Sequence, residues 1–356
     1  MTKRYDANIL IAFAQSLLKK SDLPPERAAV VADILVEGDL IGHTTHGLQL
    51  LAPYLKELGE GGMSRTGDPT VLQDRGSAVT WDGNYLPGPW LVRCAMELSF
   101  ERIATHPVMT VNVQRSHHIA CLQAYLKRAT DRGLVMLLIS SDPSCGSVTP
   151  YGGCTPVYTP NPIAAGFPTD GEPILIDIST STTTNGLTQR LYDARQRLPH
   201  EWLIDNQGRT SNDPAVLFNE PPGAILPLGG MESGHKGFAL GLLVEALTAG
   251  LGGFGRKDGP QRWGASVFMQ IIDPKAFGGL ENFKQETGWL AATCRSAAGL
   301  PDGSGVRLPG QRGLELRREY LANGVELAPT IMPLLEPWAA KLGIALPDGY
   351  DRNGHN

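Results

Sequence analysis

Apolar positions recur at helical spacing near both ends of the chain, which places them on one face of an amphipathic helix. The pattern predicts helices over residues 6–20, from about 25 to 38, up to residue 58 and over 328–342. Glycines that follow residue 58 end the first group, because glycine is the usual residue just past a helix C-terminus. A lone C-terminal helix needs a partner for its apolar face, so we expect the last helix to pack on the first group.

From about residue 64 the pattern changes, and short runs typical of strands alternate with helical runs. The helical run at 238–249 is strongly apolar, and we expect it to be buried. This alternation predicts an α/β fold, and the chain length suggests two or three subdomains. The predicted strands cover residues 108–113, 134–140, 174–178 and 265–272, and further helices cover 119–132 and most of 274–298.

Composition narrows the class of protein. Hydrophobic residues make up 42% of the 356 residues and charged residues 19%, as in an ordinary globular enzyme. The net charge of −5 and the lack of a basic cluster argue against a nucleic-acid partner, and no apolar run approaches the ~20 residues that cross a membrane. The five cysteines have no CxxC spacing, which argues against a disulfide framework or a zinc knuckle. With no secretory signal either, we expect a cytoplasmic protein.

Histidines concentrate in two short stretches that are candidates for an active site. His43 and His46 lie between glycines and would share a face if the segment were helical, and His117 and His118 are adjacent. A histidine is a natural proton donor because its ordinary pKa of ~6.5 lies near working pH. Each histidine could instead be a hydrogen-bonded structural side chain. The four together could also serve a metal-dependent hydrolase or lyase, but no acidic residue has familiar metal-ligand spacing, so we expect no metal.

Three segments are candidates for binding phosphate or ribose. Gly250–Gly255 matches GxGxxG but follows an apolar helix rather than a strand, so we interpret it as a helix end and loop. The loop Gly229–Gly237 leads into the helix at 238, and Lys236 adds a positive charge near that helix N-terminus. Hydroxyl-rich residues follow the strand that ends near Asp177. For the second and third segments, a plain glycine-rich or solvated turn remains the alternative.

Taken in order, short motifs along the chain resemble the malate/L-lactate dehydrogenase family of the non-Rossmann type. Relatives in that family include ureidoglycolate, sulfolactate and diketogulonate enzymes and reductases of cyclic imino acids. Each motif alone is weak, but the set spans most of the chain. The matching motifs are Thr45-His46-Gly47 with Tyr54, Ser116-His117-His118, Pro150-Tyr151-Gly152-Gly153, Asn161-Pro162-Ile163, Asp177-Ile178-Ser179-Thr180-Ser181, Lys236-Gly237 and Arg307-Leu308-Pro309-Gly310.

The resemblance implies an α/β fold with a non-Rossmann NAD(P)-binding domain and a helical module built from both termini. On that basis we expect residues 1–75 and 312–350 to form the helical module. Residues 76–311 would form the cofactor and substrate domain, with a small subdomain near 122–162. The family usually forms homodimers, with sites completed near the interface.

The resemblance also implies roles for individual residues. His46 would protonate the carbonyl oxygen with Thr45 as its hydrogen-bond partner, and His118 would contact nicotinamide or substrate. Tyr54 and His117 would contact the substrate. The residues expected to hold NAD or NADP are His118, Asp177, Ser179, Thr180, Lys236, Leu308, Pro309 and Gly310.

Two positions depart from the family pattern. Leu50 stands where the family commonly has an arginine, and leucine cannot hold a carboxylate as a guanidinium does. Arg115 or Arg190 could take over that role. His117 replaces an asparagine and adds a titratable group.

We therefore predict an NAD(P)-dependent oxidoreductase acting on a 2-oxo acid and 2-hydroxy acid pair. A reductase of a cyclic imino acid, and a relative that binds ligand without turnover, stay open. The sequence does not separate NADH from NADPH, because no Rossmann acidic residue marks the ribose.

Overall fold

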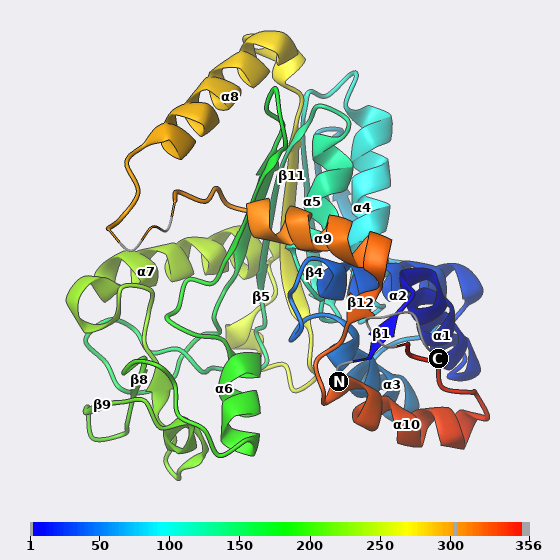
Figure 1. Cartoon of the computed structure of the whole chain (residues 1–356), viewed down its shortest axis with the longest axis vertical. Coiled ribbons are helices and arrows are strands. Elements are labelled where there is room, and N and C mark those ends of the chain that lie inside the picture. The colour runs from blue at the N-terminus through cyan, green and yellow to red at the C-terminus, as the bar shows by residue number, and fades with distance from the viewer. Residues whose placement is uncertain (1–2, 302, 304, 351–356) are drawn as a thin grey trace.

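A seven-stranded mixed sheet forms the centre of the computed structural model, which describes residues 3–301, 303 and 305–350 (Figure 1). Its strand order is β2-β3-β4-β11-β5-β6-β7. Only β3 and β4 run parallel, and every other neighbouring pair in this sheet is antiparallel, so it is not the parallel sheet of a Rossmann domain. The strands are β2 Thr70–Asp74, β3 Ala78–Asp82, β4 Val108–Ser116, β5 Val135–Ser141, β6 Ile163–Phe167, β7 Ile174–Ile178 and β11 Ala265–Ile272.

Helices cover both faces of this sheet. On one face, α4 (Gly88–Arg102) and α5 (Gln123–Thr130) join the main hydrophobic core through alternate strand residues such as Met136 and Leu138. On the other face, α7 (Gly230–Glu245) continues into a π-helical turn at Ala246–Gly250 and packs on the intervening residues. This alternation is the expected consequence of successive strand side chains pointing to opposite faces.

The helical module at the bottom right of Figure 1 combines both ends of the chain. The C-terminal helix α10 packs on α1 and α3, which confirms the expected packing of the last helix on the first group. A short strand near each end of the chain, β1 and β12, pairs antiparallel with the other, with Arg4 opposite Glu326. The module comprises β1 Arg4–Tyr5, α1 Ala7–Lys20, α2 Pro25–Leu40, α3 Leu51–Glu60, β12 Val325–Glu326 and α10 Ile331–Leu342.

The boundaries at 75 and 312 stay a prediction, and residues 1, 2, 302 and 304 of those ranges lie outside the described part of the chain. β2 lies before residue 75 but belongs to the large sheet. The two remaining long helices are α8 (Leu280–Ser296) and α9 (Gln311–Asn323).

A small satellite unit lies beside the sheet and overlaps only in part with the predicted subdomain near 122–162. Its sheet has the order β10-β8-β9 (Ala224–Ile225, Leu203–Ile204 and Thr210–Ser211), with α6 (Asn185–Asp193) alongside. Its core consists of Val148, Tyr158, Leu198, Leu203 and Ile225. The predicted subdomain at 122–162 differs, because α5 and β5 within that range belong to the main sheet and its helical layer.

Most predicted strands and helices are confirmed, and two helices needed correction. The helix predicted at 119–132 begins only at Gln123. The helix predicted from residue 238 begins at Gly230, so the glycine-rich segment 229–237 forms its first two turns rather than a loop. That helix is not fully buried either, since Leu242 and Leu243 are 52% and 48% exposed. In the described residues, no helix is long and apolar enough to span a membrane.

Candidate active site

A cavity of about 510 Å³ brings the two histidine stretches together. Its wall combines the turn after α2, the segment between β4 and α5, the ends of β5 and β7, and the start of α6. The size and the mixture of apolar walls with a few polar groups are typical of a small-molecule site. Among the predicted site residues, those that line it are Thr45, His46, His118, Asp177 and Ser179.

A buried carboxylate, that of Asp39, stabilises the turn that carries His46 by a hydrogen bond. Asp39, in the last turn of α2, is 2% exposed and accepts a 2.7 Å hydrogen bond from the Leu48 backbone N–H. Gly47 lies directly on it: a Cβ added there would come within 2.4–2.5 Å of the Asp39 carboxyl atoms. The segment is a turn and not a helix, so the condition under which His43 and His46 would share a helical face is not met.

His46 and His118 face each other across the cavity wall. Their rings are stacked with centroids 5.8 Å apart. Nδ1 of His46 lies 2.9 Å from Oγ1 of Thr45, as predicted for a hydrogen-bond partner of that ring. For Nε2 of His46, the described chain offers no hydrogen-bond partner.

The orientation of His118 is fixed by three contacts on its other side. Its Nδ1 accepts a 3.2 Å hydrogen bond from the Ala120 backbone N–H, which leaves the ring proton on Nε2. The Tyr54 hydroxyl lies 2.8 Å from the same Nδ1 and donates to the His118 carbonyl at 3.0 Å. Trp263 lies against the ring, with centroids 5.0 Å apart. His118 is therefore held as a neutral Nε2–H donor.

Tyr54 and His117 do not reach the cavity, which corrects their predicted contact with substrate. Both are fully buried. The His117 ring packs edge-on against Tyr54 and Trp263, and its Nε2 lies 3.5 Å from the Glu57 carboxylate. The two adjacent histidines therefore point in different directions, His117 into the core and His118 toward the cavity. Trp263 was not predicted as a site residue, although an aromatic side chain two residues before the predicted strand 265–272 is a detectable signal.

Burial sets the protonation of the histidines. It lowers the pKa of His46 to about 4, with a smaller contribution from His43. It also holds the pKa of His118 well below its usual value, and that of His117 at about 3. All three rings are therefore neutral at pH 7.

A second cavity of about 590 Å³ adjoins the first, because His43 lines both. Leu308, Pro309 and Gly310 line it, as expected for the late loop. That loop is anchored on β7, where the Leu175 N–H donates to the Pro309 carbonyl at 3.2 Å, two residues before Asp177. The structure thus joins two predicted cofactor segments that are far apart in sequence.

Two other predicted cofactor residues are not at either cavity. Thr180 is fully buried, and its N–H and hydroxyl both bond the Pro160 carbonyl. Lys236 is exposed in the second turn of α7 and lines neither cavity. A cofactor role for Lys236 stays a prediction.

No arginine or lysine of the described chain lines the first cavity, although Leu50 does. Arg115 is paired with Asp82, with Nε 3.0 Å from Oδ1. Arg190 donates to Oγ1 of Thr44 at 3.2 Å, on the side of the second cavity. Neither replaces the missing guanidinium in the first cavity.

The four histidines do not form a metal cluster. In the described residues, the only group of three or more His, Cys, Asp or Glu side chains whose ligand atoms all lie within 4.8 Å of one another is His43, Cys121 and Asp177. Nε2 of His43 lies 3.0 Å from the Gln123 side-chain oxygen, and Asp177 accepts the Gln123 N–H at 2.9 Å. Gln123 thus already occupies polar atoms of His43 and Asp177, and burial raises the pKa of Asp177. The hydrolase or lyase reading is not supported by this arrangement.

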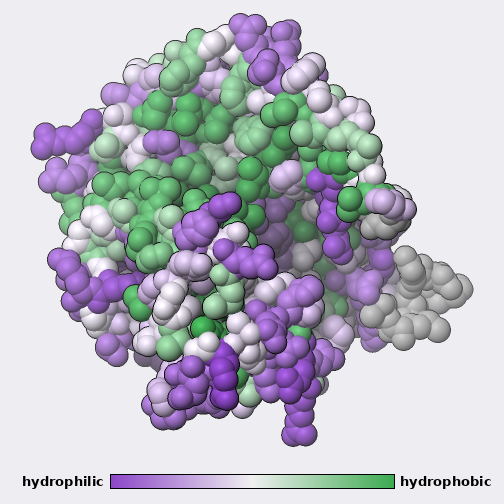
Figure 2. All heavy atoms as spheres, turned by 90° about the vertical axis from the view of Figure 1, so that its left-hand side faces the viewer, coloured by the Kyte–Doolittle hydropathy of each residue, from purple (hydrophilic) through white to green (hydrophobic). Residues whose placement is uncertain are grey.

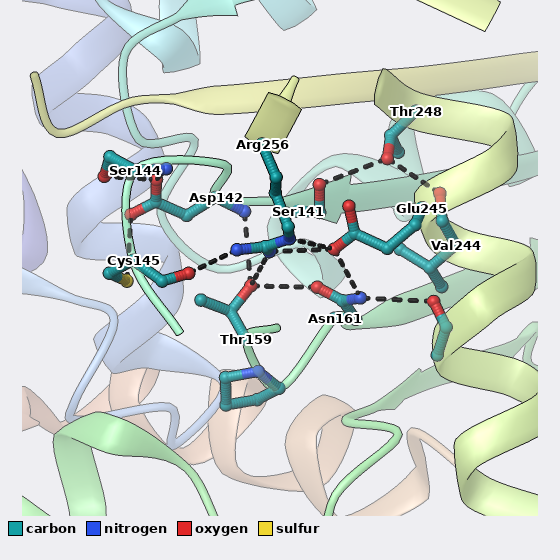
Figure 3. A network of polar contacts seen from close by, with 12 residues as sticks. Ser141, Asp142, Ser144, Cys145, Thr159, Asn161, Val244, Glu245, Thr248 and Arg256 are labelled. Atoms are coloured by element: carbon teal, nitrogen blue, oxygen red, sulfur yellow. Dashed lines mark hydrogen bonds and ion pairs between the residues drawn. The ribbon is translucent and has the colours of Figure 1, made fainter. Parts of the chain in front are cut away.

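A charged network, drawn in Figure 3, borders the first cavity, which its members Asp142, Thr159 and Asn161 line. Arg256 contacts the Glu245 carboxylate at 2.8 Å, and Asn161 donates to the same carboxylate at 2.9 Å. Asp142 lines the cavity beside this network, and burial raises its pKa. These residues come from separate loops and α7, so no local sequence pattern could have gathered them.

Comparison with known proteins agrees with this arrangement. A model of the malate/L-lactate dehydrogenase family matches residues 5–336. The chain is 28% identical over 341 residues to the L-lactate dehydrogenase of Cupriavidus necator, covering 94% of this chain and 96% of that protein. It is 30% identical over 326 residues to a Delta(1)-pyrroline-2-carboxylate/Delta(1)-piperideine-2-carboxylate reductase of Pseudomonas syringae pv. tomato, covering 88% and 90%. The solved malate dehydrogenase of Pyrococcus horikoshii matches with a TM-score of 0.87 at 25% identity, covering 98% and 97%.

Proposed function

Because this chain belongs to the malate/L-lactate dehydrogenase family and is a dehydrogenase of the malate/lactate type, we propose that it interconverts a 2-oxo acid and a 2-hydroxy acid with NAD or NADP at the His46–His118 cavity. The observation that supports this site best is the facing pair of neutral histidines. Reduction of the oxo acid requires a hydride at the carbonyl carbon and a proton at its oxygen. A bound nicotinamide dinucleotide supplies the hydride, and a side chain has to supply the proton.

His46 is the better proton donor of the two. Protonation of His118 at Nδ1 would cost it the hydrogen bond from the Ala120 N–H. Protonation of His46 at Nδ1 breaks no such hydrogen bond, because the Thr45 hydroxyl oxygen 2.9 Å away can accept a hydrogen bond from the Nδ1–H. An anionic substrate in the cavity would raise the low pKa of His46, so binding and proton uptake would be coupled. His118 would then orient the carbonyl through its Nε2–H.

The two adjoining cavities fit a dinucleotide cofactor. The nicotinamide has to reach the histidines, so the first cavity would hold it, and Asp177 and Ser179 are the polar groups that line that cavity after β7. The rest of the cofactor would extend past His43 into the second cavity, against Pro309 and Gly310. Gly310 has to be glycine there: its φ is +84°, and a Cβ would meet Leu175 at 2.7 Å.

The substrate carboxylate would have to be held without a guanidinium. The start of α6 lines the same cavity as Leu50, and the backbone N–H groups of Asn185 and Gly186 lie in the first helical turn, where they have no acceptor inside the helix. These two N–H groups offer donors to a carboxylate, while the Nε2–H of His118 serves the carbonyl. The similarity to a cyclic imine carboxylate reductase makes such imines a second substrate class to test.

The test is oxidation of NADH or NADPH, followed by absorbance, with a panel of 2-oxo acids and cyclic imino acids. His46→Ala should lower kcat by about 10²–10⁴-fold while cofactor binding, measured by fluorescence, is retained. His200→Ala is the matched control, since His200 is exposed and lines none of the cavities described above. Full activity of the His46 variant would rule out the proposed proton donor.

We also propose that the chain forms a homodimer. The face that carries α7 and α8 shows an extended hydrophobic area (Figure 2). Large apolar side chains there are unusually exposed: Trp289 by 64%, Leu251 by 57%, Met231 and Leu242 by 52%. Contiguous apolar patches on one face mark contact surfaces, and a second copy would bury the side of α7 that the sequence predicted to be buried.

Light scattering coupled to gel filtration tests the dimer. Leu242→Glu should convert the dimer to monomer, because it places a charge in the middle of the apolar side of α7. Leu72→Glu is the control, since Leu72 is similarly exposed, by 41%, on the edge strand β2. A monomeric wild-type protein would refute the proposal.

A further inference from the structure

The second cavity is lined by two arginines that have no acidic partner in the described chain, Arg307 and Arg312. Most arginines of this protein are committed elsewhere: neighbouring Arg317 and Arg318, for example, pair with Glu37 and Glu172. A third guanidinium, that of Arg190, donates to Oγ1 of Thr44, which lines this cavity. Free guanidinium groups at a cavity wall are suited to bind phosphate, often with two hydrogen bonds.

The rest of the wall also favours an anion. Its described lining contains no aspartate and no glutamate. Arg312 and Gly313 lie in the first turn of α9, where backbone N–H groups have no acceptor inside the helix and the dipole is positive. Tyr320 adds an aromatic side chain to the same wall. The described part of the cavity wall therefore offers positive charge and an aromatic surface with no opposing carboxylate.

The position of this cavity identifies which part of a dinucleotide would enter it. The nicotinamide must lie at the histidine pair in the first cavity, so the neighbouring cavity reached past His43 would receive the adenosine end. In Rossmann domains that select NAD, a carboxylate binds the 2′-hydroxyl of the adenosine ribose, whereas an arginine accommodates the 2′-phosphate of NADP. The same charge chemistry applies in any fold, and the described lining of this cavity contains arginines and no carboxylate.

We propose that this enzyme selects NADP(H) over NAD(H), with Arg307 and Arg312 binding the 2′-phosphate of the adenosine ribose in the second cavity. This inference rests on the proposed function and names the cofactor of the same site. The recognition is electrostatic and is made by side chains that the family resemblance alone does not assign. It predicts a difference between two cofactors that share every group except one phosphate.

Binding can be measured without turnover. Isothermal titration calorimetry of the full chain should give a dissociation constant for NADPH at least about tenfold lower than that for NADH. One charge-assisted hydrogen bond contributes a difference of about that size. The fragments 2′,5′-ADP and 5′-AMP should show the same order in a separate titration. These two comparisons use the unaltered protein, so they do not depend on the folding of any variant.

Two variants then assign the residues. Arg307→Met and Arg312→Met should each weaken NADPH binding about tenfold or more and leave NADH binding within about twofold. Arg75→Met is the matched control. Arg75 is exposed in the turn between β2 and β3, so this substitution removes the same charge at a position outside the cavity lining. The control should leave both dissociation constants unchanged.

Three outcomes would overturn the inference, and they are distinguishable. Equal affinity of the wild type for NADPH and NADH would refute the selection while leaving the proposed function intact. An equal loss of both cofactors in the arginine variants would assign the arginines to the shared diphosphate instead of the 2′-phosphate. Binding of neither cofactor, with no turnover on any oxo acid, would remove the proposed function as well.

Discussion

Replacing Asp39 with asparagine should change how the stability of this protein depends on pH. The Asp39 carboxyl is buried beneath the His46 turn, and burial raises its pKa to about 7. Oδ2 accepts the Leu48 N–H, and Oδ1 has no partner among the described residues. Asparagine has the same size, keeps one acceptor oxygen and is neutral at every pH. It therefore imitates the protonated form of Asp39.

The magnitude follows from the difference between folded and unfolded states. An unfolded aspartate has a pKa of ~3.9, so between about pH 4 and pH 7 the folded chain holds a proton that the unfolded chain releases. The stability contributed by Asp39 is complete below about pH 4 and is lost as pH rises through about 7. A pKa difference of about 3 corresponds to about 4 kcal/mol. Asp39→Asn should thus match the wild type near pH 4 and exceed its free energy of unfolding by up to about 4 kcal/mol at pH 8.

Urea unfolding followed by circular dichroism, at several pH values from 4 to 8 and one protein concentration, measures this difference. Asp348→Asn serves as control, because Asp348 is exposed and its variant should track the wild type at every pH. A difference between Asp39→Asn and wild type that stays constant with pH would refute the reasoning. So would a variant that is less stable than the wild type at pH 8.

Three further predictions concern the site. Gly47→Ala should destabilise the fold by about 1–3 kcal/mol and lower kcat, because its Cβ would overlap the buried carboxylate beneath it; urea unfolding compares it with Gly59→Ala, where a Cβ meets nothing within 4 Å. Tyr54→Phe should lower kcat about tenfold with cofactor affinity unchanged in a fluorescence titration, since only the hydroxyl contacts to His118 are lost. In pH profiles, kcat/KM for oxo-acid reduction should fall as pH rises above about 4, because it requires protonated His46, and kcat/KM for hydroxy-acid oxidation should rise. Reduction that is unchanged from pH 4 to 7 would exclude His46 as the group that titrates.

Local sequence patterns were sufficient for most secondary structure. Helix α1 follows from apolar spacing and from Asp6, whose side chain accepts the Asn8 and Ile9 N–H groups. Strand β7 occupies the predicted residues 174–178, because a short apolar run between turn residues has few other solutions. The rejection of GxGxxG at Gly250–Gly255 was also correct: the motif ends a helix and does not follow a strand.

Local patterns were insufficient where the environment decides the state of a residue. The segment 119–132 has helical spacing throughout, but residues 119–122 are not helical and form the cavity wall beside His118. The apolar run of α7 predicted a buried helix, and that prediction was wrong within one chain, where much of the helix is exposed. The spacing of apolar residues shows that one face of a helix is apolar, but it does not show which surface covers that face.

The sequence by itself determined the residue types of the site and their order, and through them the family. It contained both histidine stretches, the segment after β7 and the late proline-glycine loop. Tertiary structure alone decided which of these residues meet. It placed His118 against His46, withdrew His117 into the core and left Leu50 facing a cavity without a guanidinium. The physical reason is that these contacts join residues far apart in the chain, and their free energy comes from burial and long-range hydrogen bonds that no local pattern encodes.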